Sequence, residues 1–164
     1  MSQIELALFL ESAVRLGIPL ALAAMGETIT ERSGVINIGL EGSIIAGALG
    51  GALGAIALEG AGLGLAFGAL AGLLVALVFA VFAIGLGADQ IITGTAVTIG
   101  GLGMTGAVYQ VLFGANGMEL SVPTLAPVTI PWLSEIPVVG SALFAQAPTA
   151  YFAYVMAPIS WYVL

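Results

Sequence analysis

The sequence predicts an all-α fold, a polytopic bundle of four or five transmembrane helices, and composition and segment length predict it together. Hydrophobic residues make up 60% of the 164 residues and charged residues only 7%, whereas soluble domains carry about 25% charged residues. A soluble fold of this size would lack the polar residues that cover a surface. A membrane-spanning helix needs roughly 20 apolar residues to cross about 30 Å of hydrocarbon, so four or five spans fit.

The apolar segments follow one another along the chain, separated by polar or glycine-rich breaks. The first begins near Ile4 and contains Arg15 and Pro19, so we expect it to start at the membrane interface and to continue as a kinked span. Together the segments are expected to form a single transmembrane domain over residues 1–164. The later spans are expected at residues 44–58, 61–86 and 91–113, followed by a last apolar segment at 150–164.

A polar stretch at residues 26–43 interrupts the apolar pattern after the first span. It holds three acidic residues, one arginine, one asparagine and four glycines. A charge at bilayer depth costs about 3 kcal/mol, so the stretch either lies outside the hydrocarbon or lines a cavity where broken helices expose backbone groups to solute or water. Apolar residues flank Asn37, Glu41 and Ser43, which favours the cavity for these three. Asn37 and Glu41 are four residues apart and would share a face of a helix.

A second break, at residues 87–94, carries Asp89, Gln90 and Thr93. One alternative is that Asp89 is an N-cap, because its carboxylate can accept hydrogen bonds from the exposed amides that open a helix. The other is that Asp89 makes a polar contact at a helix break beside a solute path. The threonines of the following span are expected to return hydrogen bonds to their own helix; they are Thr93, Thr95, Thr98 and Thr105.

Glycines recur at four-residue spacing in the second and third spans. Small residues at this spacing lie on one helix face and let two backbones approach closely within a membrane. We therefore predict that these glycines pack the two helices together as a hairpin, with no part in binding a solute. The glycines are Gly47, Gly51, Gly60, Gly64, Gly68 and Gly72.

The segment 114–149 contains five prolines, and this composition predicts an extramembrane loop. The apolar segment after it, 150–164, supplies 15 residues, fewer than the roughly 20 that a span needs. We expect the natural protein to continue beyond Leu164.

The composition excludes most kinds of active site and metal site. The chain has no histidine or cysteine, and its two basic residues are Arg15 and Arg32, so imidazole, thiolate and Schiff-base chemistry are all absent. We therefore predict a protein that is not an enzyme, has no metal site and binds no cofactor itself. The net charge of −7 argues against nucleic acid as a partner, and the expected surroundings are membrane lipid.

Two strings carry a resemblance to a known family: ERSGVINIGLEG at residues 31–42 and GADQIITG at residues 87–94. With the approach over residues 19–27 they resemble the permease subunits of bacterial ABC importers, of the simple-sugar and nucleoside class within the branched-chain amino acid and ribose type. The resemblance extends over residues 13–113. Members of this family are longer, so the chain resembles the N-terminal half of such a permease.

The resemblance implies a multi-pass protein of the bacterial plasma membrane that works with partners. These are a second homologous permease subunit, a cytoplasmic ABC ATPase and an extracytoplasmic solute-binding protein, with ATP and Mg²⁺ bound on the ATPase. In agreement with this division of labour, the chain has no lysine and so no G-x-x-x-x-G-K-[ST] nucleotide loop.

We predict that the chain forms part of the solute pathway of an ATP-driven importer for a small polar solute, a nucleoside or a simple sugar. Two alternatives stay open. An ion-coupled secondary transporter would bind protons or Na⁺ at acidic residues within the membrane, and a non-transporting scaffold would use its glycine faces to assemble partners. The residues predicted to contribute polar groups to the pathway are Asn37, Glu41, Ser43, Asp89, Gln90 and Thr93.

Overall fold

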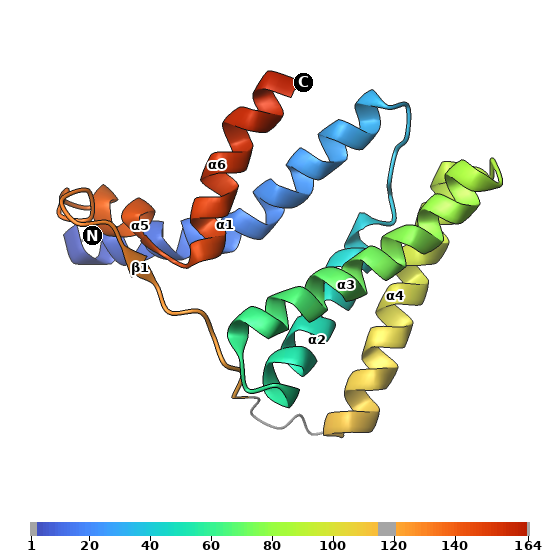
Figure 1. The fold of residues 1–164 in the computed structure, drawn as a ribbon, viewed down its shortest axis with the longest axis horizontal. Helices are drawn as coiled ribbons and strands as arrows, with labels where there is room; N and C mark the ends of the chain where they lie inside the picture. The colour runs from blue at the N-terminus through green and yellow to red at the C-terminus, as the bar shows by residue number, and fades with distance from the viewer. Residues whose placement is uncertain (1–2, 115–120, 164) are drawn as a thin grey trace. The chain divides into compact units, whose positions relative to one another are not determined.

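The computed structural model describes residues 3–114 and 121–163, and most of that length is helical (Figure 1). The predicted all-α class is confirmed, since each of the two strands comprises only two residues. The elements in chain order are α1 (Gln3–Arg32), α2 (Leu40–Ala57), α3 (Ala61–Ala80), the π-helical turn η1 (Val81–Gly85), α4 (Gln90–Phe113), β1 (Val128–Thr129), α5 (Val139–Phe144), β2 (Ala145–Gln146) and α6 (Pro148–Val163).

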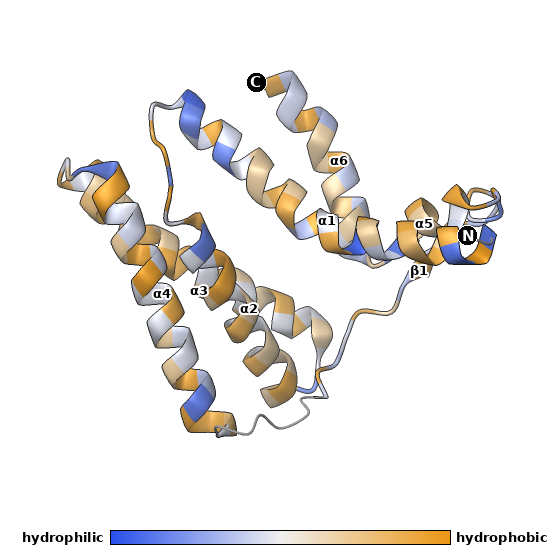
Figure 2. Cartoon of the chain, turned by 180° about the vertical axis from the view of Figure 1, so that it is seen from behind, coloured by the Kyte–Doolittle hydropathy of each residue, from blue (hydrophilic) through white to orange (hydrophobic). Residues whose placement is uncertain are grey.

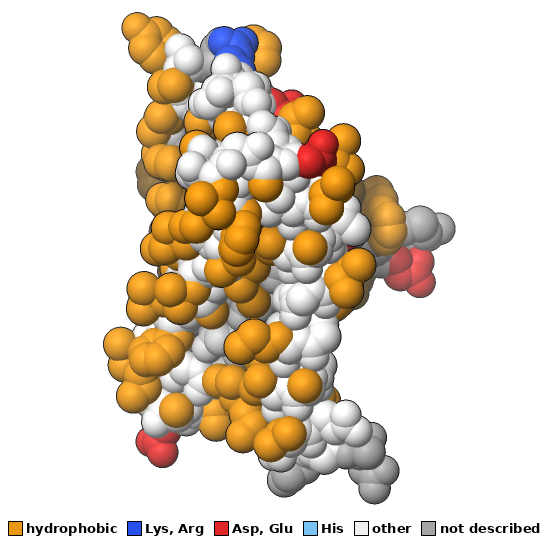
Figure 3. Space-filling view, turned by 90° about the vertical axis from the view of Figure 1, so that its right-hand side faces the viewer, with side chains coloured by type: hydrophobic (Ala, Val, Ile, Leu, Met, Phe, Trp, Pro, Cys, Tyr) orange, Lys and Arg blue, Asp and Glu red, His pale blue; other side chains and the backbone are white. Residues whose placement is uncertain are grey.

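Four helical stretches in the described part of the chain are long and apolar enough to cross a membrane, namely α1, α2, α3 continued by η1, and α4. Their large apolar side chains are widely exposed, with Leu74 at 63%, Ile99 at 65% and Val111 at 83%. Figure 3 shows apolar side chains along the whole length of one face of the molecule. Such surfaces are unfavourable in water and match a hydrocarbon environment. The predicted polytopic transmembrane bundle is therefore confirmed.

The chain divides into two compact units, one made of Met1–Arg32 with Leu125–Leu164 and the other of Ser33–Thr124. The first unit contains α1, α5, α6 and the strand pair, and the second contains α2, α3, η1 and α4. The single transmembrane domain over residues 1–164 stays a prediction.

In the second unit, α2 and α3 form a hairpin in which backbones pack directly on each other. A methyl group built at Gly68 would lie 2.9 Å from the carbonyl oxygen of Gly47, and one at Gly72 would lie 3.2 Å from that of Ser43. Gly51 and Gly64 meet in the same way. The four-residue glycine spacing thus produces a close helix contact that larger side chains would prevent.

Gly60 does not lie in this contact. It is the N-cap residue of α3, with an extended φ of −149°, and the three atoms nearest to a Cβ built on it belong to Leu58 and Leu63. The regular spacing placed Gly60 with Gly64 on one helix face, but the helix starts one residue later, so Gly60 belongs to the turn.

In the first unit, α1 continues without interruption to Arg32. The polar stretch predicted at residues 26–43 is therefore helical in its first part, and the break is confined to residues 33–39. A single glycine such as Gly26 costs a helix only about 1 kcal/mol, and the hydroxyls of Thr28 and Thr30 bond back to the carbonyls of α1. Figure 2 shows hydrophilic residues gathered toward the end of this helix.

The proline-rich segment 114–149 has more structure than the predicted loop. Its β1 and β2 pair antiparallel, with Val128 opposite Gln146, and α5 lies between the two strands in sequence. The Tyr151 hydroxyl donates to the Val128 carbonyl at 2.6 Å, and the Gln146 side chain donates to the Ala142 carbonyl at 2.7 Å. The Tyr151 bond ties the segment to α6, and the Gln146 bond lies within the segment. Residues 115–120 of the segment lie outside the described residues, and its extramembrane position stays a prediction.

Candidate functional site

Between α1 and α2 the chain is not helical over residues 33–39, hereafter the polar segment. Gly34 has a φ of +80°, a conformation that glycine adopts without steric cost and that ends many helices. The side-chain oxygen of Asn37 accepts a hydrogen bond from the Gly39 amide at 3.1 Å, which is the local turn that asparagine favours. These two residues explain why α1 ends before the segment and α2 starts after it.

The Gln90 side chain, in the first turn of α4, binds the polar segment at two points. Its Oε1 accepts from the Ile36 amide at 2.8 Å, and its Nε2 donates to the Gly34 carbonyl at 3.4 Å. A glutamine amide suits this double contact because one end accepts and the other donates. The two polar breaks identified in the sequence are thereby brought together, although 54 residues separate Ile36 from Gln90.

Thr98, two turns further along α4, binds the polar segment at a third point, where its hydroxyl donates to the Ile38 carbonyl at 3.1 Å. The expectation that Thr98 bonds to its own helix is wrong, whereas Thr95 does so with the Ile91 carbonyl at 2.8 Å. The spacing of Gln90 and Thr98 could have indicated that both contact the same segment. Residues seven or eight apart lie on similar sides of a helix, and Thr98 follows Gln90 by eight positions.

Glycines let α4 approach the polar segment and the start of α2 closely. A Cβ built at Gly94 would lie 2.8 Å from the Cβ of Ile38 and 2.9 Å from the amide nitrogen of Gly39. One at Gly101 would lie 2.9 Å from the Cα of Gly42. Real Cβ atoms essentially never approach this closely. Sequence reasoning missed these contacts, because the α4 glycines do not continue the four-residue stripe of α2 and α3.

Asp89 is the N-cap of α4, as one of the two alternatives predicted, and its contact with a solute path stays a prediction. Its Oδ1 accepts from the amides of Ile91 at 2.9 Å and Ile92 at 3.0 Å. The Thr93 amide donates to the Asp89 carbonyl at 2.9 Å, which starts the helical hydrogen-bond pattern. Asp89 therefore sets where α4 begins and how Gln90 is presented, whereas no side-chain bond links Thr93 to the polar segment within the described residues.

Replacing Asp89 with alanine is expected to lower the free energy of unfolding by about 1 kcal/mol, because two amides at the start of α4 lose their acceptor. Asp89→Asn keeps an acceptor oxygen and should change stability by only a few tenths of a kcal/mol. The midpoint of thermal unfolding, determined for both variants in the same detergent, measures the two changes in stability. Equal midpoints for the alanine and asparagine variants would contradict the capping role.

The remaining predicted residues lie at the start of α2. Glu41 is exposed in its first turn, where a negative charge interacts favourably with the helix dipole, and no ion pair engages it among the described residues. Ser43 is 8% exposed, and its hydroxyl donates to the Gly39 carbonyl at 3.5 Å. Asn37 and Glu41 do not share a helix face, because the helix begins only at Leu40.

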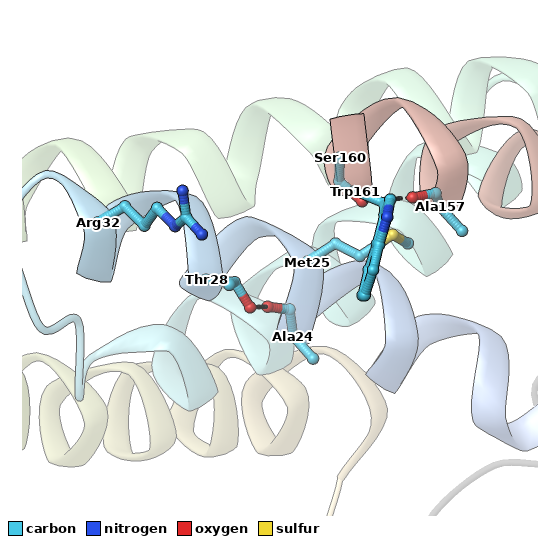
Figure 4. Close-up of a pocket in the computed structure, with 7 residues that line it drawn as sticks. All are labelled: Ala24, Met25, Thr28, Arg32, Ala157, Ser160 and Trp161. Atoms are coloured by element: carbon cyan, nitrogen blue, oxygen red, sulfur yellow. Dashed lines mark hydrogen bonds between the residues drawn. The ribbon is translucent and has the colours of Figure 1, made fainter. Parts of the chain in front are cut away.

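A groove of about 530 Å³ lies in the first unit, between the second half of α1 and α6 (Figure 4). Its two hydroxyls are turned to their own helices, since Thr28 donates to Ala24 at 2.7 Å and Ser160 to Ala157 at 2.8 Å. None of the predicted pathway residues lines it. The lining residues are Ala24, Met25, Thr28, Arg32, Ala157, Ser160 and Trp161.

The comparison with known proteins agrees with the resemblance seen in the two strings. A protein of Haloferax volcanii with the provisional name glucose ABC transporter permease is 34% identical over 94% of this chain. The guanosine ABC transporter permease of Bacillus subtilis is 36% identical and the nucleoside ABC transporter permease of Lactococcus lactis subsp. cremoris 31% identical, each over 89% of this chain. No solved structure shows significant similarity.

The chain spans about half the length of these curated relatives, from 47% to 48%. The family model that describes the permease component of branched-chain amino acid transport systems matches residues 9–164. This match includes the polar segment, the start of α4, three whole membrane-crossing helices and α1 from residue 9 onward. The protein is therefore a multi-pass membrane protein that belongs to the branched-chain amino acid transport system permease family.

Proposed function

We propose that this chain supplies part of the translocation pathway of an ATP-driven importer for a small, uncharged polar solute. The observation that carries the proposal is the polar segment. It connects two membrane-crossing helices, α1 and α2, and it is hydrogen-bonded to a third, α4. Irregular backbone at membrane depth is tolerated only where protein buries it or where it lines a water-filled cavity. Broken helices of this kind supply the solute sites of many transporters.

The solute class is supported by the groups that the segment offers and by the names of the relatives. Asn37 and the segment's backbone present hydrogen-bond donors and acceptors, and Glu41 adds an acceptor at its edge. Hydroxyl-rich neutral molecules are recognised by such groups without an opposing charge. The relatives carry the names of glucose, guanosine and nucleoside permeases, so a nucleoside or a simple sugar is the proposed solute.

The proposed partners follow from the same family. An ATP-driven importer requires a cytoplasmic ABC ATPase that binds ATP and Mg²⁺, a second permease subunit and an extracytoplasmic solute-binding protein. The relatives' names as ABC transporter permeases support this set over an ion-coupled transporter or a scaffold. This chain has no lysine for a phosphate-binding loop, so ATP hydrolysis is assigned to the ATPase partner.

Uptake of labelled guanosine and glucose tests the proposal in cells that express the complete transporter. Asn37→Ala, which removes a side-chain amide, and Glu41→Gln, which replaces a charged acceptor with a weaker neutral one, should each lower uptake by about tenfold. Glu59→Gln is the matched control: it removes the same charge from an exposed glutamate in the turn between α2 and α3, and uptake should not change.

Unchanged uptake in both pathway variants, at equal protein level in the membrane, would remove the assignment of the polar segment to the pathway. The energy source is tested separately. Uptake should persist when an ionophore dissipates the ion gradients while ATP is retained, and its loss under those conditions would favour ion coupling.

A further inference from the structure

The three hydrogen bonds between α4 and the polar segment follow a regular pattern. Gly34, Ile36 and Ile38 each give one backbone group to a side chain of α4, two of them to Gln90 and the third to Thr98. Two side chains of α4 therefore hold three backbone groups of the polar segment.

Val35 differs from the three residues that α4 binds. Val35 lies between two of the bonded residues, and its backbone makes no hydrogen bond within the described part of the chain. It is half-buried, and it is flanked by membrane-crossing helices. A backbone amide and carbonyl in such a place need a hydrogen-bonding partner, and water or a solute hydroxyl can supply it.

We infer that Gln90 and Thr98 are positioning residues, which hold the polar segment on α4 so that the Val35 backbone is presented to hydroxyl groups of the solute. The inference rests on the proposed function and refines it. Both ends of the Gln90 amide and the Thr98 hydroxyl proton are already used on the polar segment. Gln90 thus acts on the solute through the segment, and not by direct contact.

The chain offers variants that separate the individual bonds. Gln90→Ala removes two of them, whereas Gln90→Glu keeps an acceptor for the Ile36 amide and loses the donor to Gly34. Thr98→Val removes the hydroxyl at nearly constant shape, and Thr98→Ser restores it. Thr95→Val is the matched control, because it removes a hydroxyl from the same helix that bonds only to its own helix.

The first measurement is amide hydrogen exchange over residues 34–38 in the complete transporter in bilayers. Gln90→Ala should speed exchange of the Ile36 amide, the one amide that donates in the three bonds, by about two- to tenfold, the range expected for losing a net hydrogen bond. Thr98→Val removes the donor to the Ile38 carbonyl and should speed exchange of the Ile36 amide by a smaller factor, because it loosens the segment. Thr98→Ser and Thr95→Val should leave exchange as in the parent. Unchanged exchange in Gln90→Ala overturns the positioning role, whatever happens to transport.

The second measurement compares KM for guanosine and for 2′-deoxyguanosine. A loosened segment should raise KM for guanosine at least as much as for 2′-deoxyguanosine, which lacks one of the hydroxyls that the Val35 backbone could bind. The double variant Gln90→Ala with Thr98→Val should fall short of the product of the single effects, because both act on one element. A KM increase confined to 2′-deoxyguanosine, or an unchanged KM for guanosine in Gln90→Ala, would overturn the inference.

The two measurements also separate the inference from the proposed function. Faster exchange with unaltered transport kinetics overturns the solute site at Val35, although Gln90 still holds the segment. If the parent transporter takes up no nucleoside or sugar, the proposed function fails, while hydrogen exchange still decides whether Gln90 and Thr98 position the segment.

Discussion

Replacing Gly64 with alanine is expected to lower the free energy of unfolding by about 1–3 kcal/mol, the cost of overpacking a close contact. The new methyl group would lie 2.6 Å from the Cβ of Ala55 and 2.8 Å from the carbonyl oxygen of Gly51. One of these atoms belongs to the backbone of α2, so the helices must separate rather than adjust a side chain. The thermal unfolding midpoint in detergent measures the loss.

Gly62→Ala is the control for this substitution. Gly62 lies in the same helix two residues earlier, and a Cβ built there meets nothing within 4 Å. Both substitutions gain the same intrinsic preference of alanine over glycine in a helix, so their difference isolates the contact with α2. Equal unfolding midpoints for Gly64→Ala and Gly62→Ala would show that the close glycine contact between α2 and α3 does not hold the hairpin together.

Replacing Gly94 with alanine is expected to lower solute uptake by about a hundredfold, because α4 would be displaced from the polar segment and three hydrogen bonds of about 1 kcal/mol each would be lost. The methyl group would lie 2.9 Å from the amide nitrogen of Gly39 and 2.8 Å from the Cβ of Ile38. The measurement is solute uptake by the complete transporter that carries Gly94→Ala, normalised to the amount of this protein in the membrane.

Gly100→Ala serves as the companion variant for Gly94→Ala. Gly100 also lies in α4, and a Cβ there would have no neighbour within 4 Å, so uptake should stay at the parent level. A normal uptake rate in Gly94→Ala would contradict the view that close contact between α4 and the polar segment is required for transport.

The all-α membrane class and the positions of the spans could be predicted from the sequence because they depend on local properties. Hydrophobicity and segment length decide whether a helix crosses a bilayer, and both are visible without knowing the fold. The expected spans at 61–86 and 91–113 match α3 with η1 and α4 to within one residue. The N-cap role of Asp89 could also be predicted from local sequence, since the amides that it binds are two and three residues away.

The residues at which the polar break begins and ends were harder to predict from the sequence, because glycines and polar residues that can end a helix compete there with the hydrogen bonds that continue it. Gly26 and the charged residues after it suggested an early end for the first helix, but α1 runs on to Arg32 and the break starts at Ser33. The positive φ of Gly34 marks the end, and the sequence alone does not say which of several glycines adopts it. The start of α3 was uncertain for the same reason. The helix begins at Ala61, so Gly60 does not lie on the helix face where the other glycines pack.

The pairing of the two polar breaks was decided only by the tertiary structure. Composition identified the stretch at 26–43 and the break at 87–94 as separate features, and each offered polar side chains without a partner. Folding places Gln90 and Thr98 against backbone groups that lie 54 to 60 residues earlier. Such contacts depend on the close approach permitted by Gly94 and Gly101, and a hydrogen bond to a distant backbone group leaves no pattern in the local sequence.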